Sequence, residues 1–169
     1  VSDLVQANDV VILVTPIDES APKGRMILPQ QQVMRDLLDH QAITLLVQPN
    51  ELMSAINKLA EKPKLVITDS QAFGFVNKVL PADIPLTSFS ILMARYKGNL
   101  EDAVKGVKLL TSLKDGDRIL ISEGCTHHRQ CNDIGSVKLP GWIRNFTHVE
   151  PEFAFTSGGE FPTDLSSYK

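Results

Sequence analysis

The sequence predicts an α/β protein: a small parallel βαβ sheet that pairs across a dimer, followed by a second α/β domain. Apart from Asp9 and Lys64 at their starts, the segments 9–14, 42–47 and 64–68 are continuous apolar or β-branched runs, as expected for parallel strands covered on both faces. Stretches with apolar residues at helical spacing separate these runs. A further strand at 117–122 leads into a loop that holds both cysteines of the chain.

Helices are predicted between the strands of the first region. Pro29 opens a helix over 30–39, and Pro49 and Asn50 precede a second over 51–61, which Pro63 ends. Residues 69–70 cap a third helix that follows the strand at 64–68. Alternation of strands and helices predicts right-handed crossovers in a parallel sheet of three or four strands.

Such a small sheet has open edges and buries little surface for its size. Pairing one edge with a second copy of the chain would relieve both problems. We therefore predict a homodimer from physical argument alone.

The segment 80–85, rich in proline, is predicted to be a linker, which gives domains at 1–80 and 86–169. Beyond it we expect helices over 88–97 and 99–113, a short helix over 140–146, and strands over 117–122 and 152–155. Residues 164–169 resemble the approach to another strand. In the second helix, a core face is predicted from the apolar residues Leu100, Val104, Val107 and Leu110.

The loop over 123–135 carries the residue types of a metal site. Cys125, His127, His128 and Cys131 lie within seven residues, directly after a predicted strand. Thiolate and imidazole suit zinc or iron–sulfur centres, and ligands bind at the carboxyl ends of strands in α/β proteins. The spacing is not that of a zinc finger, and a second ligand pair is missing, so a plain polar loop stays open as the alternative.

Composition excludes several classes of protein. The net charge of −3 and the absence of a basic cluster with aromatics argue against nucleic-acid binding. No apolar run is long enough to span a membrane. Two cysteines form no disulfide framework, which favours the reducing cytoplasm. The chain opens on Val1 without an initiator methionine, and we interpret it as a piece of a longer protein.

The chain carries no nucleotide-binding motif of its own. Pro22-Lys23-Gly24-Arg25 places two cations beside a glycine but lacks the phosphate-loop pattern. Asn77-Lys78 resembles the start of a guanine-reading motif, yet Leu80 stands where an aspartate is needed, and no D-x-x-G occurs.

Five segments together resemble one family. They are APKGRMILPQ at 21–30, VITDSQ at 66–71, IPLTSFSIL at 84–92, ARYKG at 94–98 and CTHH at 125–128. In composition and order they are similar to the carboxyl-terminal two-thirds of HydF, the GTPase and scaffold that matures FeFe-hydrogenase. The resemblance runs from about Asp9 to Lys169.

The resemblance implies a GTPase domain, a dimerisation domain and a cluster-binding domain in the intact protein. This chain is similar to the second and most of the third, so GTP would bind only through the missing domain. Cys125-Thr126-His127 matches the first element of the family's cluster site, so the resemblance implies that Cys125 and His127 are metal ligands. The second element, His-Cys-x-x-Cys, would begin just past Lys169, so this chain alone is expected not to hold the 4Fe–4S cluster.

The resemblance further implies a scaffold or carrier, with no catalytic activity in this chain. It would receive the di-iron subcluster precursor from radical-SAM maturation enzymes and pass it to apo FeFe-hydrogenase. Two alternatives from the residues alone stay open. One is a zinc-stabilised binding module that uses Cys125, His127, His128 and Cys131. The other is an enzyme with Cys125 as nucleophile and a nearby histidine as base.

Overall fold

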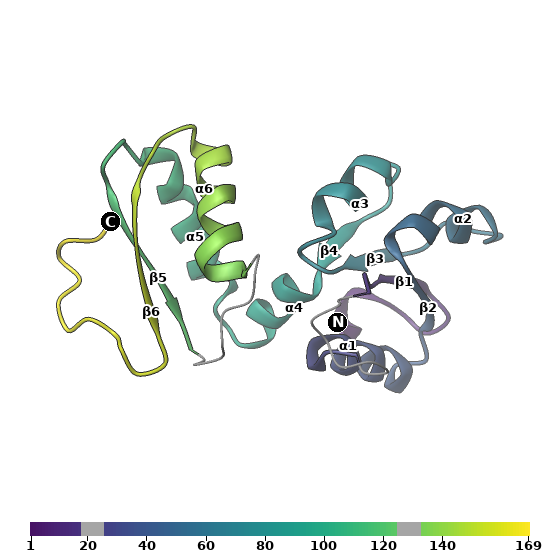
Figure 1. The fold of residues 1–169 in the computed structure, drawn as a ribbon. Helices are drawn as coiled ribbons and strands as arrows, with labels where there is room; N and C mark the ends of the chain where they lie inside the picture. The colour runs from purple at the N-terminus through teal and green to yellow at the C-terminus, as the bar shows by residue number, and fades with distance from the viewer. Residues whose placement is uncertain (18–25, 125–132) are drawn as a thin grey trace. The chain divides into compact units, whose positions relative to one another are not determined.

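The computed structural model describes residues 1–17, 26–124 and 133–169. Its contacts divide the chain into two compact units, residues 1–101 and 102–169 (Figure 1). The sequence placed the division at 80–85, whereas the structure places it after Glu101. The reason is that residues just beyond the predicted linker pair with the first sheet.

The first unit contains a four-stranded parallel sheet in the order β2-β1-β3-β4. The strands are β1 (Val10–Val14), β2 (Ile43–Val47), β3 (Leu65–Thr68) and β4 (Leu86–Ser88). The helices are α1 (Leu28–Asp39), α2 (Leu52–Asn57), α3 (Phe73–Val79) and α4 (Phe89–Tyr96), with short 3-10 turns η1 (Ser2–Leu4) and η2 (Pro49–Glu51). The predicted α/β fold with a small parallel sheet is confirmed.

Helices cover both faces of this sheet. Side chains of β1 and β3 alternate between the two faces, as the period of two requires. Val11, Leu13 and Ile67 pack with residues of α1 and α4, whereas Ile12 and Val66 pack with residues of α2 and α3. The continuous apolar runs in the sequence therefore mark strands buried on both sides.

Two boundaries in the first unit differ from the prediction. Residues Leu86–Ser88 form β4, although no strand was expected there: the predicted linker ends at 85 and the next predicted helix begins at Ser88. The Ser88 hydroxyl accepts the N–H of Ile91 at 3.2 Å, so α4 begins only at Phe89. The helix predicted over 51–61 ends at Asn57.

The second unit is a βαβ arrangement preceded by a helix. Its elements are α5 (Leu100–Leu109, which begins at the end of the first unit), η3 (Leu110–Ser112), β5 (Arg118–Glu123), the π-helical turn η4 (Ile134–Lys138), α6 (Leu139–Thr147) and β6 (Glu152–Ser157). Strands β5 and β6 pair in parallel, from Arg118 opposite Glu152 to Glu123 opposite Ser157. The crossover between them contains α6.

The second unit has little core of its own. Apart from Pro140 and Pro151, Ile121 is the only buried apolar side chain among its described residues. The core face predicted for the helix over 99–113 is wrong: α5 buries no residue, and Val104 and Val107 are 50% and 56% exposed.

The end of the chain returns to β5. No strand forms over 164–169, but the Lys169 N–H donates to the Arg118 carbonyl oxygen at 2.9 Å. The Lys169 ammonium lies 2.9 Å from the Asp117 carboxylate, and the Arg118 guanidinium lies over the Tyr168 ring. These contacts hold the last residues beside the start of β5. Within the described ranges, no helix has the length and apolar character to cross a membrane.

Candidate functional site

The loop that carries the predicted metal ligands joins β5 to η4. Cys125, His127, His128 and Cys131 all lie in 125–132, outside the described residues. Their roles therefore stay predictions, and the structure contributes the anchors of the loop.

The two ends of this loop are held against each other. Glu123, the last residue of β5, packs against the buried Gly135 of η4 so closely that a Cβ at position 135 would overlap the Glu123 carboxylate. On the other side, the Asp133 carboxylate accepts hydrogen bonds from the N–H and the hydroxyl of Ser136, at 2.8 and 2.9 Å. The loop thus starts and ends at one fixed place.

That place is the carboxyl edge of the second sheet. The Glu123 carbonyl accepts the Gly158 N–H at 2.9 Å, and the hydroxyls of Ser122 and Thr156 are hydrogen-bonded at 3.0 Å. Because β5 and β6 are parallel, both of their carboxyl ends meet here. Ligand sites in open α/β sheets favour this edge, which agrees with the position expected from the sequence.

The donor set of the chain fits an iron–sulfur cluster only in part. Such clusters take about four ligands, mostly thiolates, and this chain has two cysteines. Within the described part, no three His, Cys, Asp or Glu side chains gather as a metal site. A cluster on this loop would therefore need ligands besides the two thiols.

The first sheet also has a carboxyl edge. After β1 the chain continues to β2 on one side of the sheet, and after β3 it continues to β4 on the other side, so the two connections leave in opposite directions. The Asp69 carboxylate accepts the Gln71 N–H at 2.9 Å in a local turn, and the hydroxyls of Ser70 and Ser90 are 2.9 Å apart. Thr68 is fully buried, and its hydroxyl has no hydrogen-bond partner. Helix α3 begins only after Ala72, without a side-chain cap, so the predicted capping by residues 69–70 is wrong.

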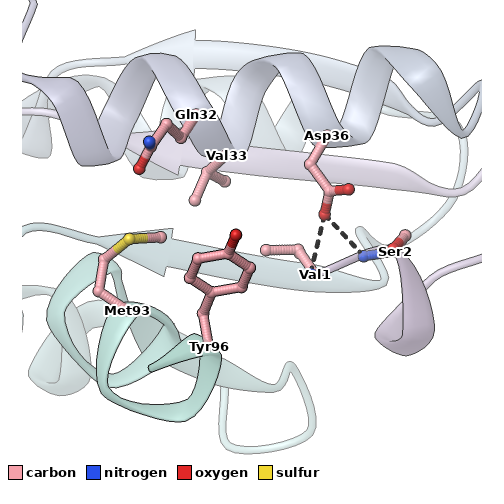
Figure 2. Close-up of a pocket in the computed structure, with 7 residues that line it drawn as sticks. All are labelled: Val1, Ser2, Gln32, Val33, Asp36, Met93 and Tyr96. Carbon is pink, nitrogen blue, oxygen red and sulfur yellow. Dashed lines mark hydrogen bonds and ion pairs between the residues drawn. The ribbon is translucent and has the colours of Figure 1, made fainter. Parts of the chain in front are cut away.

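A cavity of about 350 Å³ lies between α1, α4 and the start of the chain (Figure 2). It is lined by Val1, Ser2, Gln32, Val33, Asp36, Met93 and Tyr96. The Asp36 carboxylate points to the amino group of Val1, at 2.8 Å, and accepts the Ser2 N–H at 3.0 Å. This carboxylate is already engaged by the chain's own first residues.

Two aspartates of this region have lowered pKa values. Burial opposes ionisation of Asp36, but the Val1 amino group and the Ser2 N–H outweigh it and lower the pKa of the carboxyl. The pKa of Asp3 is lowered by its hydrogen bond from the Arg95 guanidinium. The Nδ1 atom of His40 lies 2.8 Å from the Asp36 carbonyl oxygen.

Strand β2 is the apolar edge of the first sheet. Ile43 and Leu46 are 50% and 48% exposed, although both are strand-forming apolar residues. The Ile43 N–H donates inward to the Asp9 carbonyl at 2.9 Å, so by alternation the N–H groups of Thr44 and Leu46 point out from the edge. An exposed apolar edge of this kind is a template for pairing with another chain.

Comparison with protein-family models decides the family. The model of the hydrogen maturase F (HydF) dimerization domain matches residues 1–98, and that of the HydF tetramerization domain matches residues 101–169. The chain belongs to the HydF family. Its domains indicate a part in hydrogenase maturation and show that the family self-associates through both regions. A search of curated proteins gave no match.

The matches confirm the resemblance and add one feature. The sequence predicted a dimer formed by the first region, and the first match is a dimerization domain. A second self-association domain at 101–169 was missed, because its apolar residues were assigned to a core. Apolar residues at helical spacing in α5 predict an amphipathic helix. The same spacing is expected whether the apolar face packs in the core of its own chain or against another chain.

Proposed function

We propose that this chain is the oligomerising and cluster-presenting part of a HydF scaffold that carries the di-iron subcluster precursor to apo FeFe-hydrogenase. The observation that carries the proposal is the match of both HydF models over nearly the whole chain, together with a Cys-x-His loop anchored at the carboxyl edge of a parallel sheet.

Cys125 would supply one thiolate to a 4Fe–4S cluster, with His127 as a ligand or a neighbour of the cluster. Cys131 is not part of the family element. The remaining thiolates would come from the family's His-Cys-x-x-Cys element. The cluster, when bound, supplies an iron site with an exchangeable ligand position, and the anchored ends at Glu123 and Gly135 would hold the loop for exchange with partners.

The intact protein would work with the radical-SAM enzymes that build the precursor, and with GTP bound to a separate domain. An open loop suits a carrier, because a closed site can neither accept nor release its cargo. Dimerisation and tetramerisation would present several such loops in one assembly.

Anaerobic reconstitution with iron and sulfide tests the proposal. We would compare this chain with a form extended to include the His-Cys-x-x-Cys element, each also as the Cys125→Ser and Cys131→Ser variants. We expect about four irons per chain only in the extended form, loss of the cluster with Cys125→Ser, and retention with Cys131→Ser, which is the matched control.

Equal iron uptake by the 169-residue chain would contradict this ligand assignment. Stoichiometric zinc without a brown chromophore would support the zinc-stabilised module instead. Rapid iodoacetamide labelling of Cys125 near neutral pH would support the thiol enzyme, since a catalytic thiol is ionised there. Delivery is tested by mixing the loaded extended form with apo FeFe-hydrogenase and measuring hydrogen evolution.

A further inference from the structure

The carboxyl edge of the first sheet gathers the buried polar side chains of the molecule. Within the part that the structure describes, the buried polar side chains are those of Gln30, Thr68 and Ser88. Thr68 and Ser88 are the last residues of β3 and β4 and lie opposite each other in the register. Gln30 lies in the first turn of α1, which begins at this edge because it returns the chain from β1 to the parallel strand β2.

The topology of the sheet predicts a ligand at the same edge. The strand order β2-β1-β3-β4 places a switch point between β1 and β3. Open α/β sheets bind ligands outside the carboxyl ends of their strands at such a point, and doubly wound sheets that share this strand order bind theirs between the first and third strands. The ends of β1 and β3 are in contact, since the Asp69 N–H donates to the Val14 carbonyl oxygen at 3.2 Å.

One of the three buried polar side chains lacks a partner. The Gln30 side-chain oxygen accepts the Ile27 N–H, and the Ser88 hydroxyl accepts the Ile91 N–H, each at 3.2 Å. The Thr68 side chain is fully buried, but its hydroxyl has no hydrogen-bond partner among the described residues. Because an unpaired buried hydroxyl is costly and uncommon, it indicates a partner that the protein alone does not supply.

The surface beside Thr68 carries further groups that bind phosphate. Ser70 follows β3, Ser90 lies in the first turn of α4, and both residues are exposed, with their hydroxyls 2.9 Å apart. The eight-residue helix α4 begins directly after Ser88, the register partner of Thr68, so the positive end of its dipole lies at this edge. Hydroxyl groups and helix amino termini are common phosphate ligands.

Asp69 brings a negative charge to the same edge. Its carboxylate accepts the Gln71 N–H at 2.9 Å and is held in its own turn. This charge would weaken the binding of an anion and strengthen that of a cation. In the described ranges, however, no three His, Cys, Asp or Glu side chains gather as a metal site. The hydroxyl groups and the start of α4 therefore favour an anion.

We propose that the edge formed by the ends of β3 and β4 and the start of α4 binds a phosphate group, either as the free ion or on a small organic molecule. Ser70 and Ser90 donate their hydroxyls to the phosphate oxygens, the first N–H groups of α4 face the same oxygens, and the Thr68 hydroxyl becomes paired when the ligand is bound. The site belongs to the first unit, is separate from the loop over 125–132, and needs no iron.

Calorimetric titration of the full chain with ribose 5-phosphate, inorganic phosphate and ribose tests the proposal. We expect both phosphates to bind at one site per chain and ribose not to bind; the tighter of the two phosphates identifies the source. Ser70→Ala with Ser90→Ala should weaken binding about tenfold or more, because hydrogen bonds to a charged group are lost. Ser166→Ala removes an exposed hydroxyl from the second unit and, as the matched control, should bind like the unmodified chain.

Asp69→Asn distinguishes an anion from a cation. Removal of the negative charge should tighten phosphate binding, whereas loss of binding in this variant would show that the carboxylate holds a cation and would overturn the proposal. Amide NMR of the unmodified chain keeps the test valid if a variant does not fold, and we expect the signals of Ser70 and Ser90 to shift with phosphate.

Three other results would overturn the proposal: no binding of either phosphate, equal binding by the double variant, or phosphate-induced shifts confined to residues away from this edge. Iron uptake is a separate measurement, so failure here leaves the carrier proposal intact.

Discussion

The two units of the chain use similar elements but differ in where their apolar side chains lie. In the first unit, the side chains of Val11, Ile12, Leu13 and Val14 are fully buried between helices on both sheet faces. In the second, Ile121 is nearly the only buried apolar residue of the described part, while Val107, Trp142 and Phe146 remain exposed. The first unit therefore has a core of its own, whereas the described residues of the second unit bury little apolar surface within the chain.

The largest effect on stability is expected from a substitution in the core of the first unit. Leu37 of α1 is fully buried against the sheet, so Leu37→Ala should lower the free energy of unfolding of this unit by about 2–5 kcal/mol. Val107→Ala in the dissociated chain should change the stability of the second unit by less than about 0.5 kcal/mol.

Hydrogen exchange of peptides from each unit measures the first change, and fluorescence of Trp142, the single tryptophan, follows the second unit. If the two substitutions lowered the free energy of unfolding by equal amounts, the proposed difference in core packing between the two units would be contradicted.

The next effect concerns the β2 edge. Leu46→Pro removes an N–H that points out from the sheet and leaves the inward hydrogen bonds to β1 in place. We expect dimerisation through the first unit to be lost, which would halve the mass of the assembly in sedimentation measurements. Leu46→Thr keeps the N–H and is the control. Full dimerisation of the proline variant would show that association does not use this edge.

A smaller effect is expected at the base of the cluster loop. Gly135→Ala forces the Glu123 carboxylate to move, which should cost about 1 kcal/mol in the second unit. Gly141→Ala is the control, because no atom lies within 4 Å of the added methyl group and the residue is helical; it should stabilise by about 0.5–1 kcal/mol. Thermal unfolding followed by Trp142 fluorescence measures both changes in stability. If both substitutions changed the stability in the same direction, the assigned contact between Glu123 and Gly135 would be contradicted.

The smallest effect concerns how the last residues are held. The Lys169 ammonium and the Lys114 N–H lower the pKa of Asp117. A carboxyl whose pKa is lower in the folded state stabilises the fold above its unfolded pKa, about 4, and this contribution is lost as the pH falls through the folded value.

Asp117→Asn should therefore flatten the fall in stability of the second unit below about pH 4. Unfolding titrations between pH 7 and 3 provide the measurement. An identical pH slope in Asp117→Asn and the unmodified chain would mean that Lys169 does not act on this carboxylate.

The sequence was most informative where burial is two-sided. The run at 10–14 is apolar throughout, rich in β-branched residues and short, which is typical of a parallel strand covered on both faces, so the first sheet could be predicted. Strand β4 was missed because Leu86–Ser88 is short and follows Pro85, and its strand character comes from pairing with β3. The periodicity of α5 was recognised, but periodicity does not reveal whether the covering surface belongs to the same chain.

The same limit applies to the candidate site. Adjacent cysteine and histidine residues after a strand predicted the loop and its sheet edge. The contact between Glu123 and Gly135 could not be predicted, because it joins residues on either side of the loop through the packing of η4 on β5.

The division after Glu101 has a consequence for symmetry. It places the residues that match the dimerization domain, 1–98, and nearly all of those that match the tetramerization domain, 101–169, on different units, so each self-association has its own two-fold axis if both contacts are isologous. When the two axes intersect at a right angle, four chains close into a finite assembly with dihedral symmetry; when the axes do not intersect, the same contacts continue without closing. The angle between the two axes would depend on how the chain joins the units around Glu101 and Asp102.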